Sequence, residues 1–229
     1  MITYPCAAIV FDLDGVLVDS SVVVERHWRR WASEHQLDLD TILATSPGKR
    51  NVEVMAEFAP HLNAAREAAA MDAAEALDTD GIIPYPGAGA LLRNLPADRW
   101  AVATSGAIDT AIARLRIAEL PMPTVLITAD QVQHGKPHPE PYLRAAASLG
   151  LSPERCVAVE DAPSGVHSAK NAGMTVIAIA STMPPETLQH ADAVLLSLLE
   201  LSWAMDPAED QPASAPRVLV QIPAQRLQG

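Results

Sequence analysis

The stretch Ile9–Ser20, which reads IVFDLDGVLVDS, decides the fold of this chain. Its first residues are apolar and predict a buried strand, and Asp12 and Asp14 follow at a spacing of i, i+2 before a turn that contains Gly15. Both acids therefore leave the predicted sheet at a carboxyl end, where ligands bind in open α/β sheets. Two adjacent carboxylates repel each other and lose solvation, which is typical of a site that holds a cation or moves a proton. An ordinary Asp-rich turn is the alternative, because Asp and Gly are common turn formers.

The size and charge of the chain limit its possible partners. Its 229 residues, 49% of them hydrophobic, suit one medium core or a core with a small inserted domain. The formal net charge of −12, with no compensating basic stripe, argues against nucleic acid or an anionic membrane as partners. An anionic substrate would need a local positive site. We expect a monomer or a weak homodimer.

The cysteines and the hydropathy pattern favour a reducing, aqueous compartment. Cys6 and Cys156 each enter an apolar, strand-like run, and one such pair does not make a disulfide framework, so we expect buried, reduced thiols. The N-terminus lacks a basic segment before its short apolar run, and no stretch approaches the ~18 apolar residues of a membrane span. These features predict a soluble, cytoplasmic protein.

The pattern of the chain changes at residues 80–87, where Gly and Pro mark a boundary. Before it, residues 22–78 read as helical, with Trp28, Trp31 and His35 spaced at i, i+3, i+7. After it, strands and helices alternate. The expected strands are Trp100–Ala103, Val125–Ile127, Cys156–Glu160, Thr175–Ala180 and Ala193–Leu196. The expected helices lie near Ala88–Leu95, Ile108–Leu115, Glu140–Leu149 and Pro163–Asn171.

This order predicts an α/β fold, a parallel sheet with helices on both faces and a helical block over its carboxyl edge. We expect residues 1–18 and 84–205 to form the core domain, 19–83 a helical cap domain, and 206–229 a flexible tail. Residues 206–216 carry Pro, Ala, Glu and Asp with little to bury, which favours disorder. An edge strand or a partner contact at Val218–Ile222 is the alternative.

Three further strand ends carry polar residues. Thr104, Ser105 and Gly106 follow a strand and precede a helix, so hydroxyls and N–H groups could cradle a phosphate, although a plain helix N-cap looks the same. Lys136 lies between Gly135 and two prolines, in rigid backbone, yet most lysines are simply solvated.

The last of these strand ends carries adjacent acids. Glu160 and Asp161 close an apolar strand. His134 and His138, near Lys136, have no acidic or histidine partner at metal spacing, so we interpret them as neighbours rather than ligands.

Together the four strand ends resemble the four motifs of the haloacid dehalogenase superfamily, in the family order. The resemblance implies a Rossmann-like core with an inserted all-helical cap domain. It also implies a phosphatase in which Asp12 is the nucleophile and Asp14 the acid/base. Thr104 would grip a phosphoryl oxygen, and Lys136 would neutralise both the nucleophile and the phosphoryl group. The N–H groups of Ser105 and Gly106 would stabilise further charge.

The resemblance also implies a Mg²⁺ cofactor. Asp12 and Asp161 side chains and the Asp14 main-chain carbonyl would hold it, and Glu160 would act from its edge.

Within the superfamily, the chain is similar to the glycerol-3-phosphatase and 2-deoxyglucose-6-phosphatase group, which are sugar phosphatases. Residues 100–106 (WAVATSG), 136–142 (KPHPEPY) and 160–165 (EDAPSG) carry the likeness, with Gly48-Lys49-Arg50 in the cap. A small phosphate ester is then the expected partner. Arg50 could bind a substrate hydroxyl or phosphate, although a surface Arg is equally consistent.

Three alternatives remain. β-Phosphoglucomutase shares all four motifs, but its cap carries a His where this chain has Val24. Dehalogenases lack the acid and the metal ligand that Asp14 and Asp161 provide. A degenerate scaffold that binds a partner is the non-enzymatic alternative, because fold does not guarantee activity.

Overall fold

A six-stranded parallel sheet forms the centre of the molecule, with strand order β6-β5-β2-β7-β8-β9. A computed structural model describes residues 1–206 and 218–224. The strands are β2 (Ala8–Phe11), β5 (Trp100–Ala103), β6 (Leu126–Ile127), β7 (Cys156–Glu160), β8 (Thr175–Ile179) and β9 (Ala193–Leu195). Every expected strand forms within its expected range. Because β2 lies between β5 and β7, the chain after Phe11 leaves the sheet at the middle of its carboxyl edge.

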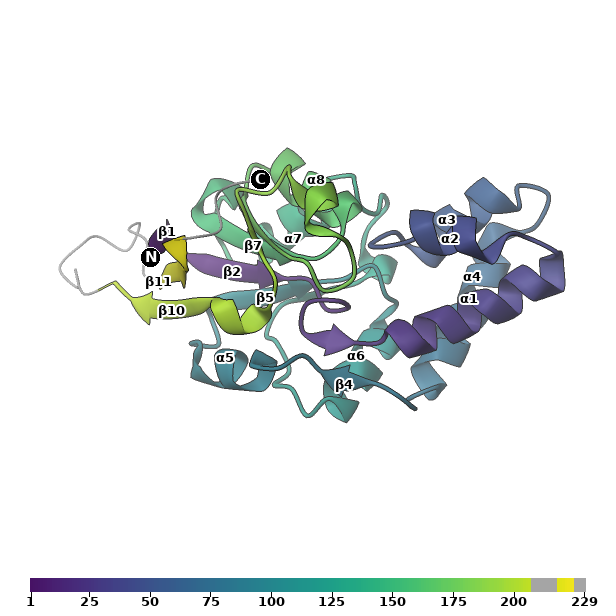
Figure 1. Ribbon diagram of the computed structural model, residues 1–229, viewed down its shortest axis with the longest axis horizontal. Helices are drawn as coiled ribbons and strands as arrows, with labels where there is room; N and C mark the ends of the chain where they lie inside the picture. The colour runs from purple at the N-terminus through teal and green to yellow at the C-terminus, as the bar shows by residue number, and fades with distance from the viewer. Residues whose placement is uncertain (207–217, 225–229) are drawn as a thin grey trace.

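Helices cover both faces of this sheet (Figure 1). The helices α5 (Ala88–Asn94) and α6 (Ile108–Ile117) pack on one face, and α7 (Glu140–Ser148) and α8 (Pro163–Asn171) pack on the other. The period of two along β2 explains this arrangement, because alternate side chains enter opposite cores. Phe11 packs in a cluster with Leu115 of α6, whereas Val10 packs in a cluster with Tyr142 of α7. The predicted α/β fold is confirmed.

The segment between two very short strands is helical. β3 (Val18–Asp19) and β4 (Ile83–Pro84) pair antiparallel, and between them lie α1 (Ser21–His35), α2 (Leu39–Thr45), α3 (Asn51–Phe58) and α4 (Ala64–Leu77). These helices lie beyond one end of the parallel sheet (Figure 1) and share an apolar cluster that includes Trp28, Ile42 and Met55. Their own core agrees with a cap domain, whose exact boundaries stay a prediction.

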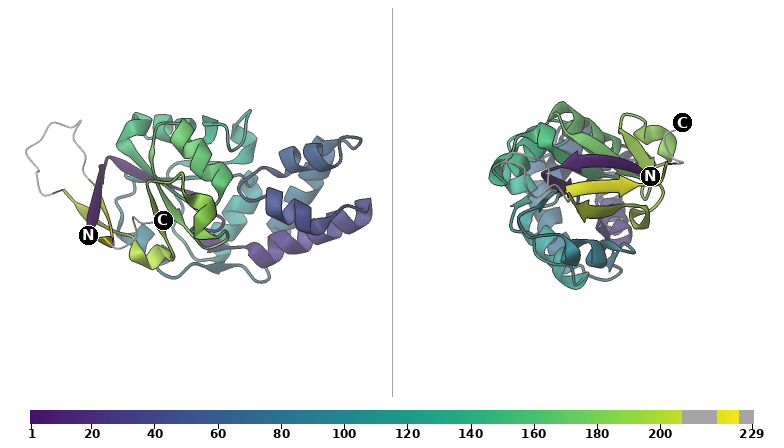
Figure 2. Two further views of the ribbon diagram at one scale, coloured as in Figure 1. Left: turned by 45° about the horizontal axis from the view of Figure 1, so that its top comes forward. Right: turned by 90° about the vertical axis from the view of Figure 1, so that its left-hand side faces the viewer.

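A second, small sheet lies at the opposite end of the molecule. It has the order β1-β11-β10, formed by β1 (Ile2–Cys6), β11 (Val218–Ile222) and β10 (Ser202–Met205), all antiparallel (Figure 2). The expectation of a flexible tail is therefore wrong for Val218–Ile222, and the strand alternative holds there. Val218, Val220 and Ile222 alternate and are fully buried against the cluster that contains Phe11, which gives this segment apolar surface to bury. Residues 207–217, where disorder was also expected, lie outside the described residues.

Short 3-10 helices occupy Ala129–Gln131, Pro153–Arg155, Pro185–Leu188 and Leu198–Glu200. Among the described residues, no helix combines the length and the apolar character needed to cross a membrane.

Candidate active site

A cavity of about 290 Å³ opens where the carboxyl edge of the sheet faces the helices α1 to α4. Its lining from the sheet side includes Asp12, Asp14, Thr104, Ser105, Gly106 and Asp161. Its lining from the helical side includes Val24, Trp28, Leu43, Lys49, Asn51 and Glu75. Strand ends separated by up to about two thirds of the chain in sequence therefore line one cavity.

The buried ammonium of Lys136 contacts two carboxylates beside this cavity. Its Nζ lies 3.0 Å from Asp12 Oδ1 and 2.6 Å from Glu160 Oε1. Burial raises the pKa of Asp12 to about 7, although the Lys136 charge opposes that rise. Burial lowers the pKa of Lys136, but the charges of Asp12 and Glu160 outweigh it and the net shift is upward. Lys136 is thus a fixed positive charge beside the proposed nucleophile.

Glu160 is held by several donors at the end of β7. Its Oε1 accepts hydrogen bonds from Lys136 and from the Tyr142 hydroxyl at 2.5 Å. Its Oε2 accepts from the backbone N–H of Asp161 at 3.0 Å and of Ala162 at 3.4 Å. A Cβ at Gly165 would lie 1.8 Å from Oε1, so only glycine leaves room for this carboxylate. We expected Glu160 at the edge of a metal site, and its contacts show that it holds Lys136 in place.

Carboxylate oxygens of Asp12, Glu160 and Asp161 lie within 4.8 Å of one another. The three acids face one buried ammonium, that of Lys136, which leaves excess negative charge if all are ionised. Burial also raises the pKa of Asp161 well above its ordinary value. Among the described residues no cationic side chain pairs with Asp161, whose Oδ2 accepts from the Thr182 hydroxyl. A hard divalent cation bound by oxygen ligands fits this donor set and this charge.

The loop after β5 carries the predicted phosphate cradle. The Thr104 side chain is buried, and its Oγ1 accepts from the Gly106 N–H at 3.0 Å. The Ser105 hydroxyl donates to the carbonyl of Gly48 in the helical segment at 2.7 Å. Both residues line the cavity, and the hydroxyl of Ser105 also ties the loop to the helical segment.

Asp14 is held by two donors. Its Oδ1 accepts from the Ser20 hydroxyl at 2.7 Å, and its Oδ2 lies 2.8 Å from Arg114 Nη1. Arg114 is itself paired with Glu75 of α4, with Nη2 and Oε2 2.7 Å apart. The result is a chain of three charged side chains that joins the β2 loop, helix α6 and helix α4.

Sequence reasoning missed both Arg114 and Glu75, although each leaves a signal. Arg114 lies on the buried face of α6 beside Leu115, and Glu75 lies on the buried face of α4 with Met71. A charged residue on an otherwise apolar helix face predicts a buried partner.

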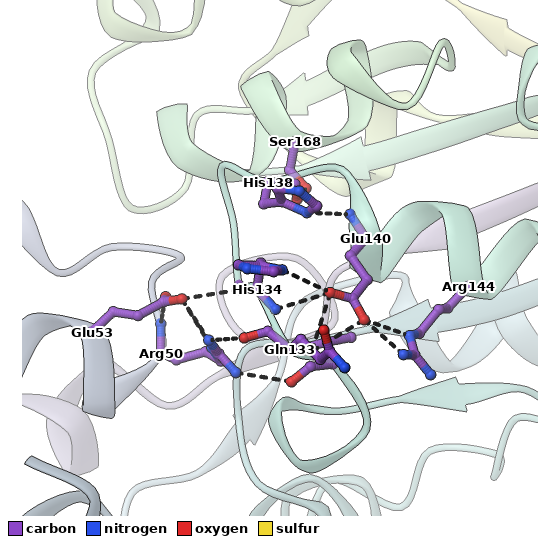
Figure 3. A network of polar contacts seen from close by, with 10 residues as sticks. Arg50, Glu53, Gln133, His134, His138, Glu140, Arg144 and Ser168 are labelled. Carbon is purple, nitrogen blue, oxygen red and sulfur yellow. Dashed lines mark hydrogen bonds and ion pairs between the residues drawn. The ribbon is translucent and has the colours of Figure 1, made fainter.

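Arg50 does not occupy the place expected for a substrate ligand. Its guanidinium donates to the carbonyls of Val132 at 3.1 Å and Gln133 at 2.9 Å, and to Glu53 Oε1 at 2.7 Å (Figure 3). Glu53 Oε1 also accepts from the N–H of Gly135, the residue before Lys136. In this structure the donors of Arg50 join α3 to the loop that carries Lys136, and its role as a phosphate ligand stays a prediction.

The structure places Glu140 beside His134 and His138, and the sequence did not indicate this acidic neighbour. One ligand atom each of His134, His138 and Glu140 lie within 4.8 Å of one another. The carboxylate of Glu140, however, accepts hydrogen bonds from the backbone of Gln133 and His134 and from Arg144 (Figure 3). These donors already occupy both of its oxygens, so Glu140 serves to order the loop before Lys136.

The family model of the haloacid dehalogenase-like hydrolases matches residues 6–173. The chain belongs to this family. Hexitol phosphatase A of Escherichia coli is 42% identical over 210 residues, which cover 90% of this chain and 97% of that protein. Glycerol-1-phosphate phosphohydrolase 1 of Saccharomyces cerevisiae is 35% identical over 203 residues, which cover 80% of this chain and 78% of that protein. The expected likeness to the sugar phosphatase group is confirmed.

The fold of this haloacid dehalogenase-like hydrolase also matches solved structures. The crystal structure of a hydrolase from Pseudomonas syringae superposes with a TM-score of 0.76 at 27% identity, covering 85% of this chain and 95% of that chain.

Proposed function

We propose that this hydrolase is a Mg²⁺-dependent phosphatase that cleaves a small sugar or polyol phosphate through an aspartyl-phosphate on Asp12. One observation carries the proposal. The Asp12 carboxylate lies on the cavity wall with Lys136 Nζ 3.0 Å away, and Asp14 and Thr104 line the same cavity. Two relatives, by name, act on hexitol phosphates and on glycerol 1-phosphate, which supports a small polyol or sugar ester.

The reaction has two steps. A carboxylate oxygen of Asp12 bonds to phosphorus while the ester P–O bond breaks, and Asp14 gives its proton to the departing alcohol oxygen. Water then attacks the aspartyl-phosphate, Asp14 takes a proton from that water, and the P–O bond to Asp12 breaks to release phosphate. Lys136 and Thr104 bind phosphoryl oxygens as their charge develops.

Oxygens of Asp12 and Asp161, with the main-chain carbonyl of Asp14, would hold the Mg²⁺ ion. When bound, it offsets the charge on the transferring phosphoryl group. This assignment fits the cluster of carboxylates described above, whose negative charge Lys136 balances only in part.

Phosphoryl transfer between sugar positions, as in β-phosphoglucomutase, is the second candidate. That reaction needs a phosphoenzyme protected from water. Val24 lines the cavity where the resemblance places the mutase histidine, and an apolar side chain there offers no hydrogen bond. Hydrolysis is therefore better supported than phosphoryl transfer. Measured hydrolysis of a phosphate ester would also exclude the alternative of a scaffold without catalysis.

The decisive experiment measures kcat/KM with Mg²⁺ for sn-glycerol 3-phosphate, sorbitol 6-phosphate, 2-deoxyglucose 6-phosphate, fructose 1-phosphate and p-nitrophenyl phosphate. Asp12→Asn should abolish turnover of all five, and the exposed Asp98→Asn should leave it unchanged. Turnover by Asp12→Asn at the wild-type rate, or no turnover of any ester by the wild type, would refute the proposal.

A further inference from the structure

Arg114 on helix α6 contacts the side chain of Asp14 and orients it. Arg114 of α6 reaches Oδ2 with Nη1 at 2.8 Å, while Ser20 holds Oδ1 at 2.7 Å. Glu75 fixes the other end of the guanidinium at 2.7 Å from Nη2. Two donors from opposite sides therefore leave the Asp14 carboxylate little freedom to rotate.

Burial of the Arg114 side chain costs free energy of folding. It is 3% exposed, and its Nε has no hydrogen-bond partner among the described residues. An unsatisfied buried donor costs about 1–3 kcal/mol, and stability alone would favour an apolar side chain here. This cost agrees with a role for Arg114 in the reaction.

Arg114 also lies close to the phosphate cradle. A Cβ built on Gly106 would be 3.9 Å from Arg114 Nη1, 4.0 Å from Asp14 Oδ2 and 3.4 Å from Thr104 Oγ1. The guanidinium, the Asp14 carboxylate and the Thr104 hydroxyl thus lie around one part of the cavity wall.

We propose that Arg114, anchored by Glu75, is a positioning residue that holds Asp14 for proton transfer to the leaving alcohol. This inference rests on the proposed phosphatase function. Each carboxylate oxygen has two lone pairs, so the contacts with Arg114 and Ser20 leave one on each oxygen for the transferred proton. Arg114 stays protonated and carries no proton itself. Its effect is geometric, because proton transfer requires the donor within hydrogen-bond reach of the alcohol oxygen.

This role predicts a dependence on the leaving group. A sugar or polyol alkoxide is a poor leaving group and needs the proton from Asp14 as the P–O bond breaks. The p-nitrophenolate ion leaves without one. Loss of Arg114 should therefore slow the cleavage of alkyl phosphates and spare p-nitrophenyl phosphate. The appropriate quantity is kcat/KM, which covers the first chemical step and excludes hydrolysis of the aspartyl-phosphate.

The test compares Arg114→Met and Arg114→Lys with Arg116→Met, an exposed arginine on the same helix. We expect Arg114→Met to lower kcat/KM for sorbitol 6-phosphate by about 10- to 100-fold, a fraction of what a general acid contributes. For p-nitrophenyl phosphate the loss should stay below about 3-fold, and Arg114→Lys should recover part of the alkyl phosphate rate. Equal losses on both substrates would overturn the proposal and would indicate that Arg114 binds the phosphoryl group or merely maintains the fold.

Two further variants separate this inference from the function on which it rests. Glu75→Gln should show the same leaving-group dependence with a smaller loss, and it serves if Arg114→Met does not fold. Asp14→Asn should show the dependence most strongly. If Asp14→Asn shows it and the Arg114 and Glu75 variants do not, Arg114 is no positioning residue and the phosphatase function stands. If Asp12→Asn keeps wild-type activity, the phosphatase function itself fails.

Discussion

Lys136 and Glu160 form an ion pair in which Nζ lies 2.6 Å from Oε1 and both side chains are fully buried. Lys136 is therefore held by Glu160 as well as by Asp12, and its loop is held by Glu53 and Glu140. In this arrangement the ammonium cannot move away from Asp12 and Glu160 without leaving the Glu160 charge unpaired.

Replacement of Glu160 by Gln should impair both stability and catalysis. The amide keeps one acceptor oxygen and places N–H groups against donors, so we expect a loss of about 2–4 kcal/mol in the free energy of unfolding and at least about 10-fold in kcat. Urea unfolding and steady-state assays measure the two effects. The exposed Glu154→Gln is the matched control and should change neither. A Glu160→Gln variant as stable and as active as the wild type would contradict the role assigned to this pair.

Removal of divalent ions should inactivate the enzyme and reduce its thermal stability. Without a cation, the carboxylates of Asp12, Glu160 and Asp161 have only Lys136 to balance them. Dialysis against a chelator should lower Tm, and added Mg²⁺ should restore both Tm and activity by binding the folded state. An Asp161→Asn variant should respond to Mg²⁺ much less. Full activity in the presence of excess chelator would exclude the proposed metal.

Lys49 and Arg50 are adjacent cations that the structure places differently. Lys49 lines the cavity, with its Nζ 3.2 Å from Glu57 Oε2, whereas Arg50 bonds to the carbonyls of Val132 and Gln133. We therefore expect Lys49→Met to raise KM for sorbitol 6-phosphate by about 3- to 10-fold, the scale of one weakened polar contact, with little change in kcat. Arg50→Met should change KM less than about 2-fold and lower Tm instead, because it breaks contacts between α3 and the Lys136 loop. The reverse pattern in KM would show that Arg50 is the substrate ligand after all.

The contribution of Glu140 to stability should disappear in acid. Hydrogen bonds from the Gln133 backbone, with those from His134 and Arg144, lower the pKa of Glu140 from 4.5 to about 2. The folded state therefore prefers the ionised carboxylate, so its stabilisation is present above pH 4.5 and is lost as the pH falls toward 2. Glu140→Gln should lower the urea midpoint near neutral pH and have less than about half of that effect at about pH 3. If the difference in urea midpoint between variant and wild type stays constant with pH, packing explains the effect and the charge of Glu140 does not.

The strand β11 should be essential to the stability of the core. Val220 is fully buried, so Val220→Ala should cost about 2 kcal/mol through lost burial and a residual cavity. Leu219→Ala, at the half-buried neighbouring position, should cost clearly less. Urea unfolding compares the two variants, and equal effects would mean that β11 is not held against the core as described.

Much of the fold is predictable because its signals are local. The apolar runs of Trp100–Ala103 and Cys156–Glu160 coincide with β5 and β7, and each polar strand end follows such a run. Parallel strands bring their carboxyl ends to one edge, so Asp12, Thr104 and Asp161 share a cavity for topological reasons.

The contacts that escaped prediction join segments far apart in sequence. The pairing of Arg114 with Glu75 depends on how α6 meets α4, and the direction of Arg50 depends on the position of the loop at Val132. Strand β11 pairs with β1 from near the other end of the chain. Neither periodicity nor residue type specifies which distant surfaces meet, and only the packed structure does.

The place of β11 between β1 and β10 has a consequence for biosynthesis. Strand β1 can pair with β11 only after residue 222 has left the ribosome. Until then the small sheet cannot form, and the apolar residues that Val218 and Ile222 cover in the folded protein stay exposed.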